Sequence, residues 1–189
     1  MKKKIITILI IAAILAGISY HLYGKDNIRF KYSYEIVNNE VLGNNKKIKV
    51  RIPFDNKIKY MSNEELEEFL ENGTGLLYFG YSTCPWCRNA VPVLIESARN
   101  NNMTINYIDI KSVKLSDTVY EILNDYLRED ENGNKVLAVP DVYVLEEGEI
   151  LEHHLGCIDG YTNPYVEMTE SEKIQLQEIY DEMIKELKG

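Results

Sequence analysis

A continuous apolar run, GLLYFGY at residues 75–81, constrains the fold more than any other part of this sequence. A run of this kind, without polar alternation, is typical of a strand that is buried on both faces of a sheet. A helical pattern begins three residues later at Cys84, and its apolar residues recur at helical spacing: Cys87, Val91, Leu94, Ile95 and Ala98. The sequence therefore predicts a buried strand that leads through two cysteines into a helix.

The chain from residue 57 onward continues to alternate between strand and helix patterns. The predicted elements are strands at 57–61, 75–81 and 104–110, helices at 63–73, from Cys84 and at 116–130, a loop at 130–135, a hairpin within 139–156 and a closing helix from Thr169. Crossover connections place consecutive strands parallel, and a hairpin adds antiparallel neighbours. We therefore expect an α/β fold with a mixed central β-sheet flanked by helices on both faces.

The first 23 residues have the pattern of a targeting segment. Three lysines at positions 2–4 precede an apolar run at 5–18, and the chain stays uncharged to residue 23. The run has the length of a signal-peptide core, and with the residues up to 23 it is long enough to span a bilayer. Because lysines stay on the cytoplasmic side, residues after 23 are expected outside the cell membrane, either tethered by this anchor or secreted after its cleavage.

Residues 24–56 are predicted to be a linker or a small N-terminal extension of the domain at 57–189. Alternating residues favour short strands at 29–37 and 46–54, and the polar stretch at 38–45 favours a turn. Two interpretations stay open, a spacer from the membrane and a hairpin laid against the domain.

Net charge and cysteine count narrow the classes of function. The chain of 189 residues is 45% hydrophobic, which suits one domain with its own core, and its net charge is −9. That charge disfavours nucleic acid and anionic membrane surfaces as partners. One close cysteine pair and a third thiol, Cys157, do not form the framework of a disulfide-stapled mini-protein. We therefore expect Cys84 and Cys87 to be a working couple.

The CPWC stretch at 84–87 has the chemistry of a thiol–disulfide couple. Only a thiolate is nucleophilic, and a helix N-terminus stabilises that anion through its dipole and its free N–H groups. Pro85 suits the first helical turn, and Arg88 is expected to add a positive charge nearby. Cys84 is therefore predicted to be the attacking thiol and the more deeply buried Cys87 the resolving thiol. Each turnover would pass through a mixed disulfide with the substrate.

These residues resemble the thioredoxin family. The resemblance runs from about residue 57 to 187 and includes the strand into CPWC, Pro92 eight residues after the first cysteine, AVPD at 138–141 and the closing helix. It implies a thioredoxin-like fold, a cis-Pro140 beside the cysteines, and Val139 as a backbone partner of extended substrates. Within the superfamily, the stretch at 78–94 is similar to membrane-tethered proteins of Gram-positive bacteria, some of which are bacteriocin-transport accessory proteins.

The targeting segment and the sulfur couple together predict the kind of partners the chain would use. Its substrates would be cysteine-containing exported proteins or peptides, a membrane redox partner would reset it, and no cofactor beyond the Cys84–Cys87 disulfide would be needed. Trp86 is expected to be exposed and to hold an apolar substrate segment.

The sequence departs from the thioredoxin pattern at the site itself. Thr83 replaces a tryptophan, and Pro-Trp replaces Gly-Pro between the cysteines. Tyr78 stands where thioredoxins bury an aspartate that serves the second cysteine. Proton transfer to Cys87 is therefore expected to go through water, with Asp109 and Glu96 as weaker candidates. These departures leave the direction of electron flow open.

Three other interpretations were weighed against the redox couple. A static disulfide has no need of a helix N-terminus. A metal site would need His153 and His154 to join the cysteines, but adjacent residues on a strand point to opposite faces. A non-catalytic binding module would use the surface around Pro140 and Trp86. Cys157 is either a buried small residue or a third redox thiol.

Overall fold

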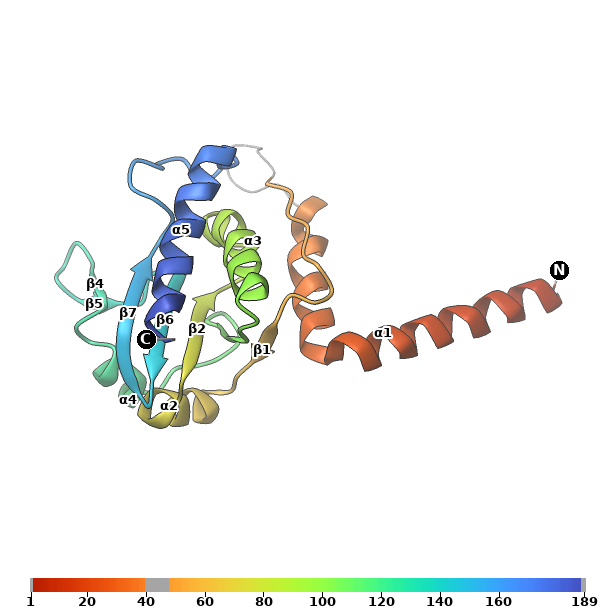
Figure 1. Ribbon diagram of the computed structural model, residues 1–189, viewed down its shortest axis with the longest axis horizontal. Helices are drawn as coiled ribbons and strands as arrows, with labels where there is room; N and C mark the ends of the chain where they lie inside the picture. Colours follow the sequence, from red (N-terminus) through yellow and green to blue (C-terminus); the bar gives the residue numbers. More distant parts are fainter. Residues whose placement is uncertain (1, 40–47, 188–189) are drawn as a thin grey trace.

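The computed structural model describes residues 2–39 and 48–187, and at its centre is a five-stranded sheet (Figure 1). The strands, in the order β1-β3-β2-β6-β7 across the sheet, are β1 (Ile58–Tyr60), β3 (Ile105–Asp109), β2 (Gly75–Gly80), β6 (Asp141–Glu146) and β7 (Glu149–Leu155). The first three are mutually parallel, whereas β6 and β7 run antiparallel to their neighbours. The predicted mixed sheet and its closing hairpin are confirmed.

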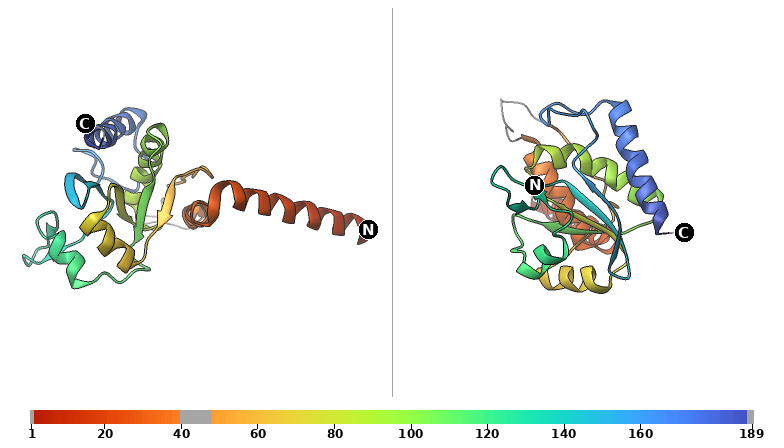
Figure 2. Two further views of the ribbon diagram at one scale, coloured as in Figure 1. Left: turned by 60° about the horizontal axis from the view of Figure 1, so that its bottom comes forward. Right: turned by 90° about the vertical axis from the view of Figure 1, so that its left-hand side faces the viewer.

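Helices cover both faces of this sheet. Helices α3 (Pro85–Asn100) and α5 (Glu170–Glu186) pack on one face, and α2 (Asn63–Asn72) and α4 (Asp117–Ile122) pack on the other, as the left view of Figure 2 shows. Both predicted capping boxes are present, Ser62 with Glu65 at α2 and Thr169 with Glu172 at α5. Each box satisfies two backbone donors at a helix start, which fixes where α2 and α5 begin.

Strand β2 is the most deeply buried element. All six of its residues are buried, as its uninterrupted apolar sequence predicted. Leu76 and Tyr78 face the core under α3 and α5, while Leu77 and Phe79 face the core under α2 and α4. The strand leads to the start of α3, so the cysteines follow the carboxyl end of the central strand.

The strand predicted at 29–37 is wrong, because this stretch is helical. It belongs to α1 (Lys2–Ile36) and the following single turn η1 (Val37–Asn39). Phe30, Tyr34 and Val37 are buried, and their spacing of four and three residues fits a helix as well as alternation fits a strand. The helical period prevails because this face packs against the domain.

The strand predicted at 46–54 is not formed within the described residues, because 48–53 have no strand and a turn follows at 54–55. Ile48, Val50 and Ile52 are buried in alternation, which is the pattern that favoured a strand. Their partner is a helix rather than another strand, since the Asn38 side chain donates to the Val50 carbonyl (2.8 Å) and accepts from its N–H (2.9 Å). Most of the predicted turn at 38–45 lies outside the described residues.

The helix predicted at 116–130 is too long. Helix α4 ends at Ile122, and a small hairpin follows, formed by β4 (Arg128–Glu129) and β5 (Lys135–Val136). Asn and Asp at positions 124–125 are weak helix formers. The Asp130 carboxylate accepts hydrogen bonds from the N–H groups of Asn132 (2.8 Å) and Asn134 (2.9 Å), and these bonds stabilise the turn of the hairpin. The stretch predicted as a plain loop is therefore this turn.

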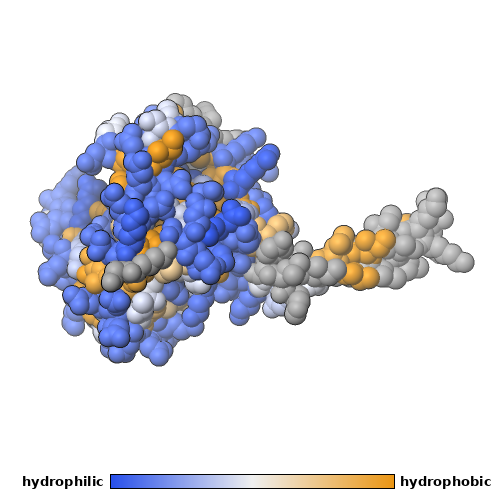
Figure 3. All heavy atoms as spheres, in the orientation of Figure 1, coloured by the Kyte–Doolittle hydropathy of each residue, from blue (hydrophilic) through white to orange (hydrophobic). Residues whose placement is uncertain are grey.

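The N-terminal helix changes direction at Gly24, whose φ of 74° is not helical. Residues 25–36 then lie beside β1, while the first part of α1 projects away from the domain (Figure 1). Figure 3 shows a mainly hydrophilic domain surface and apolar atoms on the projecting part, where Ile11, Ile14 and Leu15 are exposed. Within the described ranges, no helix combines the length and the apolar character needed to cross a membrane. The anchor at 1–23 stays a prediction.

Candidate active site

The two cysteines lie where β2 gives way to α3. Cys84 is the N-cap residue of α3, with extended backbone, and Pro85 is the first helical residue. The Cys84 sulfur accepts a hydrogen bond from the backbone N–H of Cys87 at 3.1 Å. The Cys84 N–H in turn donates to the Tyr81 carbonyl at 3.2 Å, which closes the turn between strand and helix. Cys84 therefore occupies the position where the free N–H groups at the start of a helix can donate hydrogen bonds to an anion.

The two sulfurs have opposite acid–base characters. The pKa of Cys84 is lowered, chiefly by a hydrogen bond from the Cys87 side chain and further by the backbone N–H groups of Cys87 and Trp86, against the opposing effect of burial. Burial raises the pKa of Cys87 well above its ordinary value, and its interaction with Cys84 raises it further. Cys87 is fully buried and Cys84 nearly so, and both are free thiols. Cys84 is therefore the sulfur that ionises first.

The segment before β6 lies against the first cysteine. The peptide bond between Val139 and Pro140 is cis, as the resemblance implied. The Cys84 thiol lies 3.9 Å from the Val139 carbonyl oxygen, and the Pro140 carbonyl accepts from the N–H of Gly156 at 2.8 Å. The structure thus brings Val139 and Pro140 to the cysteines. The use of Val139 by a substrate stays a prediction.

Trp86 is half-buried, so the prediction of an exposed indole is wrong. Its ring packs edge-on against Tyr161, with centroids 5.6 Å apart. Tyr161 belongs to the segment between β7 and α5, which crosses over the cysteine loop. Because this contact joins residues far apart in the sequence, the residues next to Trp86 could not have predicted its burial.

Cys157 lies next to the site as a buried residue. Its thiol approaches the Trp86 carbonyl oxygen at 3.8 Å, and it is 7% exposed. Burial raises the pKa of Cys157 to about 12, with a further contribution from Cys84. At neutral pH this thiol is therefore protonated and a poor nucleophile.

Arg88 joins backbone segments at the start of α3, and its predicted charge effect on the sulfurs stays a prediction. The side chain is fully buried, and its guanidinium donates to the carbonyl oxygens of Tyr34 (2.9 Å), Ile48 (2.8 and 3.1 Å) and Ser82 (2.9 Å). It also donates to the Asn38 side chain. Arg88 therefore fastens Tyr34, Asn38 and Ile48 to the start of α3.

Tyr78 is fully buried behind the cysteines and meets a residue that sequence reasoning did not single out. Its hydroxyl lies 3.3 Å from the hydroxyl of Tyr34, which comes from α1. The helical spacing of Tyr34 and its buried neighbours was the signal that would have found it. Of the carboxylates weighed earlier, Glu96 is exposed, and Asp109 accepts from the N–H of Lys111 at 3.0 Å.

The histidines do not converge with the cysteines. His153 Nε2 lies 2.6 Å from an Asp141 carboxylate oxygen, whereas His154 donates to the Cys157 carbonyl and meets Tyr180 on the other face. The prediction that these adjacent side chains point to opposite faces is confirmed. Among the residues described, no group of three or more potential ligands is placed to hold a metal ion.

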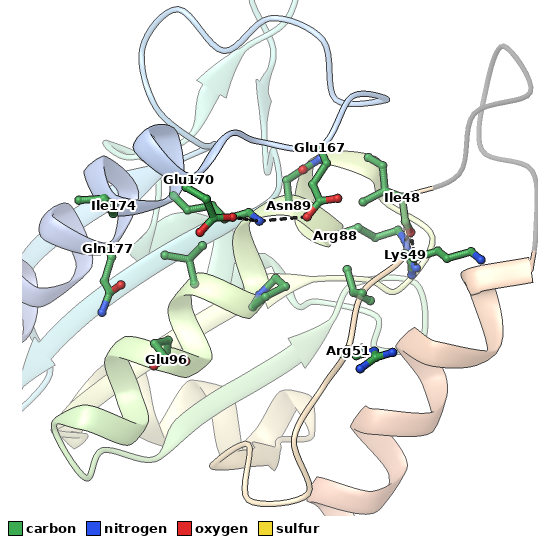
Figure 4. A pocket seen from close by; sticks show the side chains of 14 residues that line it. Ile48, Lys49, Arg51, Arg88, Asn89, Glu96, Glu167, Glu170, Ile174 and Gln177 are labelled. Atoms are coloured by element: carbon green, nitrogen blue, oxygen red, sulfur yellow. Dashed lines mark hydrogen bonds and ion pairs between the residues drawn. The ribbon is translucent and has the colours of Figure 1, made fainter.

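A pocket of about 300 Å³ lies beside the site, between α3, α5 and residues 48–51 (Figure 4). Arg88 and Asn89 contribute to its wall, but none of the cysteines does. Glu167 and Glu170 at its rim pair with Lys173 at 3.0 and 2.9 Å. The pocket is therefore lined by side chains of both charges and is separate from the sulfurs.

Comparison with known proteins leaves the family of this chain unassigned by sequence: no family model and no curated protein matches it. Similar solved structures include a thioredoxin of Plasmodium falciparum (20% identical, TM-score 0.39, covering 65% of this chain and 98% of its own). Thioredoxin O2 of Arabidopsis thaliana is 18% identical with a TM-score of 0.44 (68% and 96%). A Schistosoma mansoni thioredoxin pre-protein is 14% identical with a TM-score of 0.40 (67% and 98%). The site's chemistry therefore has to be argued from its own geometry.

Proposed function

We propose that this protein is a thiol–disulfide oxidoreductase in which Cys84 is the nucleophile and Cys87 the resolving thiol. The observation that carries the proposal is the placement of Cys84 at the N-cap of α3, where its sulfur accepts the Cys87 N–H at 3.1 Å. A static pair has no use for two sulfurs of opposite acidity, whereas exchange needs one thiolate that attacks and one thiol held in reserve.

The reaction proceeds in two balanced steps. In the first step the Cys84 thiolate attacks a substrate disulfide, one sulfur of the substrate leaves as a thiolate, and a mixed disulfide forms. In the second step Cys87 loses its proton and attacks the Cys84 sulfur. The bond to the substrate breaks and the Cys84–Cys87 disulfide forms. Of the two substrate thiolates, one takes up the proton released by Cys87 and the other takes one from solvent. Run backward, the same steps oxidise a substrate dithiol.

The surroundings of Cys84 suit an extended substrate. The cis-proline segment lies against this sulfur, with the Val139 carbonyl 3.9 Å away. We expect Val139 to pair through its backbone with the chain beside a substrate cysteine. Trp86, whose ring packs against Tyr161, would offer an apolar surface beside that substrate chain.

The location and partners proposed for the protein follow from its N-terminal sequence. The lysines at positions 2–4 and the apolar run at 5–18 support an anchor or signal, with the domain outside the cytoplasmic membrane. Its substrates would then be cysteine-containing exported proteins or peptides, and a membrane redox partner would restore the cysteine pair. A membrane-impermeant thiol reagent that labels Cys84 in intact bacterial cells would support this location, and labelling only after lysis would contradict it.

The test of the proposed function is covalent trapping. A Cys87→Ser variant lacks the resolving thiol and is expected to accumulate mixed disulfides that run as high-mass species on non-reducing gels. The double variant Cys84→Ser/Cys87→Ser is the matched control and should trap nothing. A single variant that traps no more than the control would contradict the proposal, and a biological activity that survives Cys84→Ser would indicate a binding module instead.

A further inference from the structure

The second cysteine has a hydroxyl cluster behind it that the two-step reaction has not used. Cys87 is fully buried, so its thiolate cannot be solvated by bulk water when it forms. A buried thiolate needs a hydrogen-bond donor close by, because an uncompensated charge in an apolar core is costly. Tyr78 and Tyr34 bring two buried hydroxyls, 3.3 Å apart, to this core.

Tyr78 is placed for this role by β2. Its ring stacks on Tyr107 with centroids 5.4 Å apart, on the sheet face that α3 covers. A β-carbon added to Gly80 would lie 2.4 Å from the Tyr78 hydroxyl oxygen. The hydroxyl therefore lies beside Gly80, the last residue of β2 before the cysteine turn, and the absence of a side chain at position 80 makes room for it.

Tyr34 continues the chain of hydroxyls. It comes from the N-terminal helix, is fully buried, and places its hydroxyl 3.3 Å from that of Tyr78. Arg88 fixes this contact, because its guanidinium donates to the Tyr34 carbonyl at 2.9 Å. The residue that follows Cys87 in the sequence thus holds the second hydroxyl in position.

The titration behaviour of these groups agrees with their geometry. Burial is the largest influence on the pKa of Cys87 and raises it, whereas a hydrogen bond with the Tyr78 side chain acts in the opposite direction. Burial raises the pKa of Tyr34 and of Tyr78 well above the ordinary tyrosine value, and the negative charge of Cys87 adds to both effects. Both hydroxyls therefore stay protonated and remain donors.

We propose that Tyr78 and Tyr34 form a two-member hydroxyl chain that stabilises the Cys87 thiolate while it attacks the mixed disulfide on Cys84. Tyr78 donates to the sulfur, and Tyr34 acts through Tyr78. Both are positioning residues and keep their protons. The proton lost by Cys87 is balanced by the proton that the departing substrate thiolate takes up. This inference rests on the proposed function and gives the N-terminal extension a part in it.

The test separates the two cysteines in one experiment. The full-length reduced protein, carrying Cys157→Ala throughout, is mixed with one equivalent of a chromogenic aromatic disulfide, dithiobis-nitrobenzoate. The first coloured thiolate is released when Cys84 attacks, and the second when Cys87 resolves the mixed disulfide. Rates of both phases are then followed across a range of pH.

Tyr78→Phe should leave the first phase unchanged and slow the second about tenfold, since a hydrogen bond to a charged group is lost. The pH profile of the second phase should move to higher pH. Tyr34→Phe should slow the second phase about threefold, because it weakens the donor only indirectly. Tyr180→Phe is the matched control: Tyr180 is buried in the same core, and within the described residues its hydroxyl has no hydrogen-bond partner.

The outcomes distinguish this inference from the function on which it rests. A second phase in Tyr78→Phe that matches the Tyr180→Phe control in rate and pH profile would overturn the hydroxyl chain and leave the oxidoreductase intact. A parent protein that releases no second coloured thiolate would overturn both. If Tyr78→Phe does not fold, Tyr34→Phe decides alone, and a second phase unchanged from the control would refute the proposal.

Discussion

The two faces of the central sheet each bury a polar cluster beside the cysteines, and the clusters differ in what they can ionise. Under α3 the cluster consists of tyrosine hydroxyls, with Tyr34 and Tyr78 3.3 Å apart. Under α4 it contains a carboxylate, because Asp141 accepts from the Tyr143 hydroxyl at 2.8 Å and lies 2.6 Å from His153 Nε2. The two clusters lie at the same level of the sheet. Tyr78 on β2 pairs with Val142 on β6, and Val142 is the residue next to Asp141.

This difference separates two tasks within one site. In the proposed mechanism the hydroxyl face serves the sulfur that must become an anion, with donors that stay neutral. The carboxylate face supports the cis-proline segment, because Asp141 follows Pro140 directly and is tied to β7 through His153. The account therefore predicts that changes on the first face alter the chemistry of Cys87, and that changes on the second face alter the stability of the substrate-binding segment.

The largest expected effect comes from Arg88, which attaches the N-terminal extension to the hydroxyl face. Arg88→Ala leaves buried carbonyl groups without donors and releases Tyr34, so the free energy of unfolding should fall by about 3–5 kcal/mol. Urea unfolding of the full chain measures this. Arg99→Ala is the control, since Arg99 forms an exposed pair with Asp55 and should cost under about 1 kcal/mol. Equal losses in the two variants would contradict the structural role of Arg88.

The next effect is on the carboxylate face. Asp141→Ala removes the acceptor of the Tyr143 hydroxyl and the partner of His153, and should lower the free energy of unfolding by about 2–3 kcal/mol. Tyr143→Phe removes only one of these interactions and leaves the carboxylate paired with His153, so it should cost about 1 kcal/mol. Thermal or urea unfolding compares the two. An Asp141→Ala protein as stable as the parent would show that this face does not support the cis-proline segment.

A smaller effect is expected at Gly80, and it probes the hydroxyl face directly. Gly80→Ala places a methyl group 2.4 Å from the Tyr78 oxygen, on a rigid buried ring, and should cost about 1–3 kcal/mol. A Tyr78→Phe background removes that oxygen but keeps the ring carbon 2.6 Å from the added methyl, so the same substitution should lose only part of its cost. A double-mutant cycle measured by urea unfolding tests this. Additive costs would mean that the hydroxyl does not lie against Gly80.

The smallest expected effect is a pH dependence carried by the carboxylate face. Burial raises the pKa of Asp141 above its ordinary value, against the opposing hydrogen bond from His153. The folded protein therefore holds this proton more tightly than the unfolded chain, and the stability it contributes is lost as pH rises through the folded-state pKa. The stability of Asp141→Asn, relative to the parent, should therefore increase as pH rises from about 4. A difference that stays constant with pH would contradict the shift.

The site's core could be predicted from sequence because its signals are local. The apolar run of β2, the N-cap position of Cys84 and Pro85 in the first turn all depend on neighbouring residues. The burial of Trp86 and the structural contacts of Arg88 were not predicted, because their partners, the Tyr161 ring and the Tyr34 carbonyl, come from distant segments. The helical conformation of residues 29–37 was missed because a short run of apolar residues can fit both the helical period and the strand period. Packing against the domain decides between the two.

The most direct test of the account is a redox titration of the full chain in thiol buffers, with the disulfide identified by mass spectrometry. The account predicts one two-electron transition that links Cys84 to Cys87, with a potential between about −270 and about −120 mV, the range of thioredoxin-like couples. The transition should vanish in Cys84→Ser and in Cys87→Ser and persist in Cys157→Ala. A transition that survives Cys84→Ser, or a disulfide that includes Cys157, would contradict it.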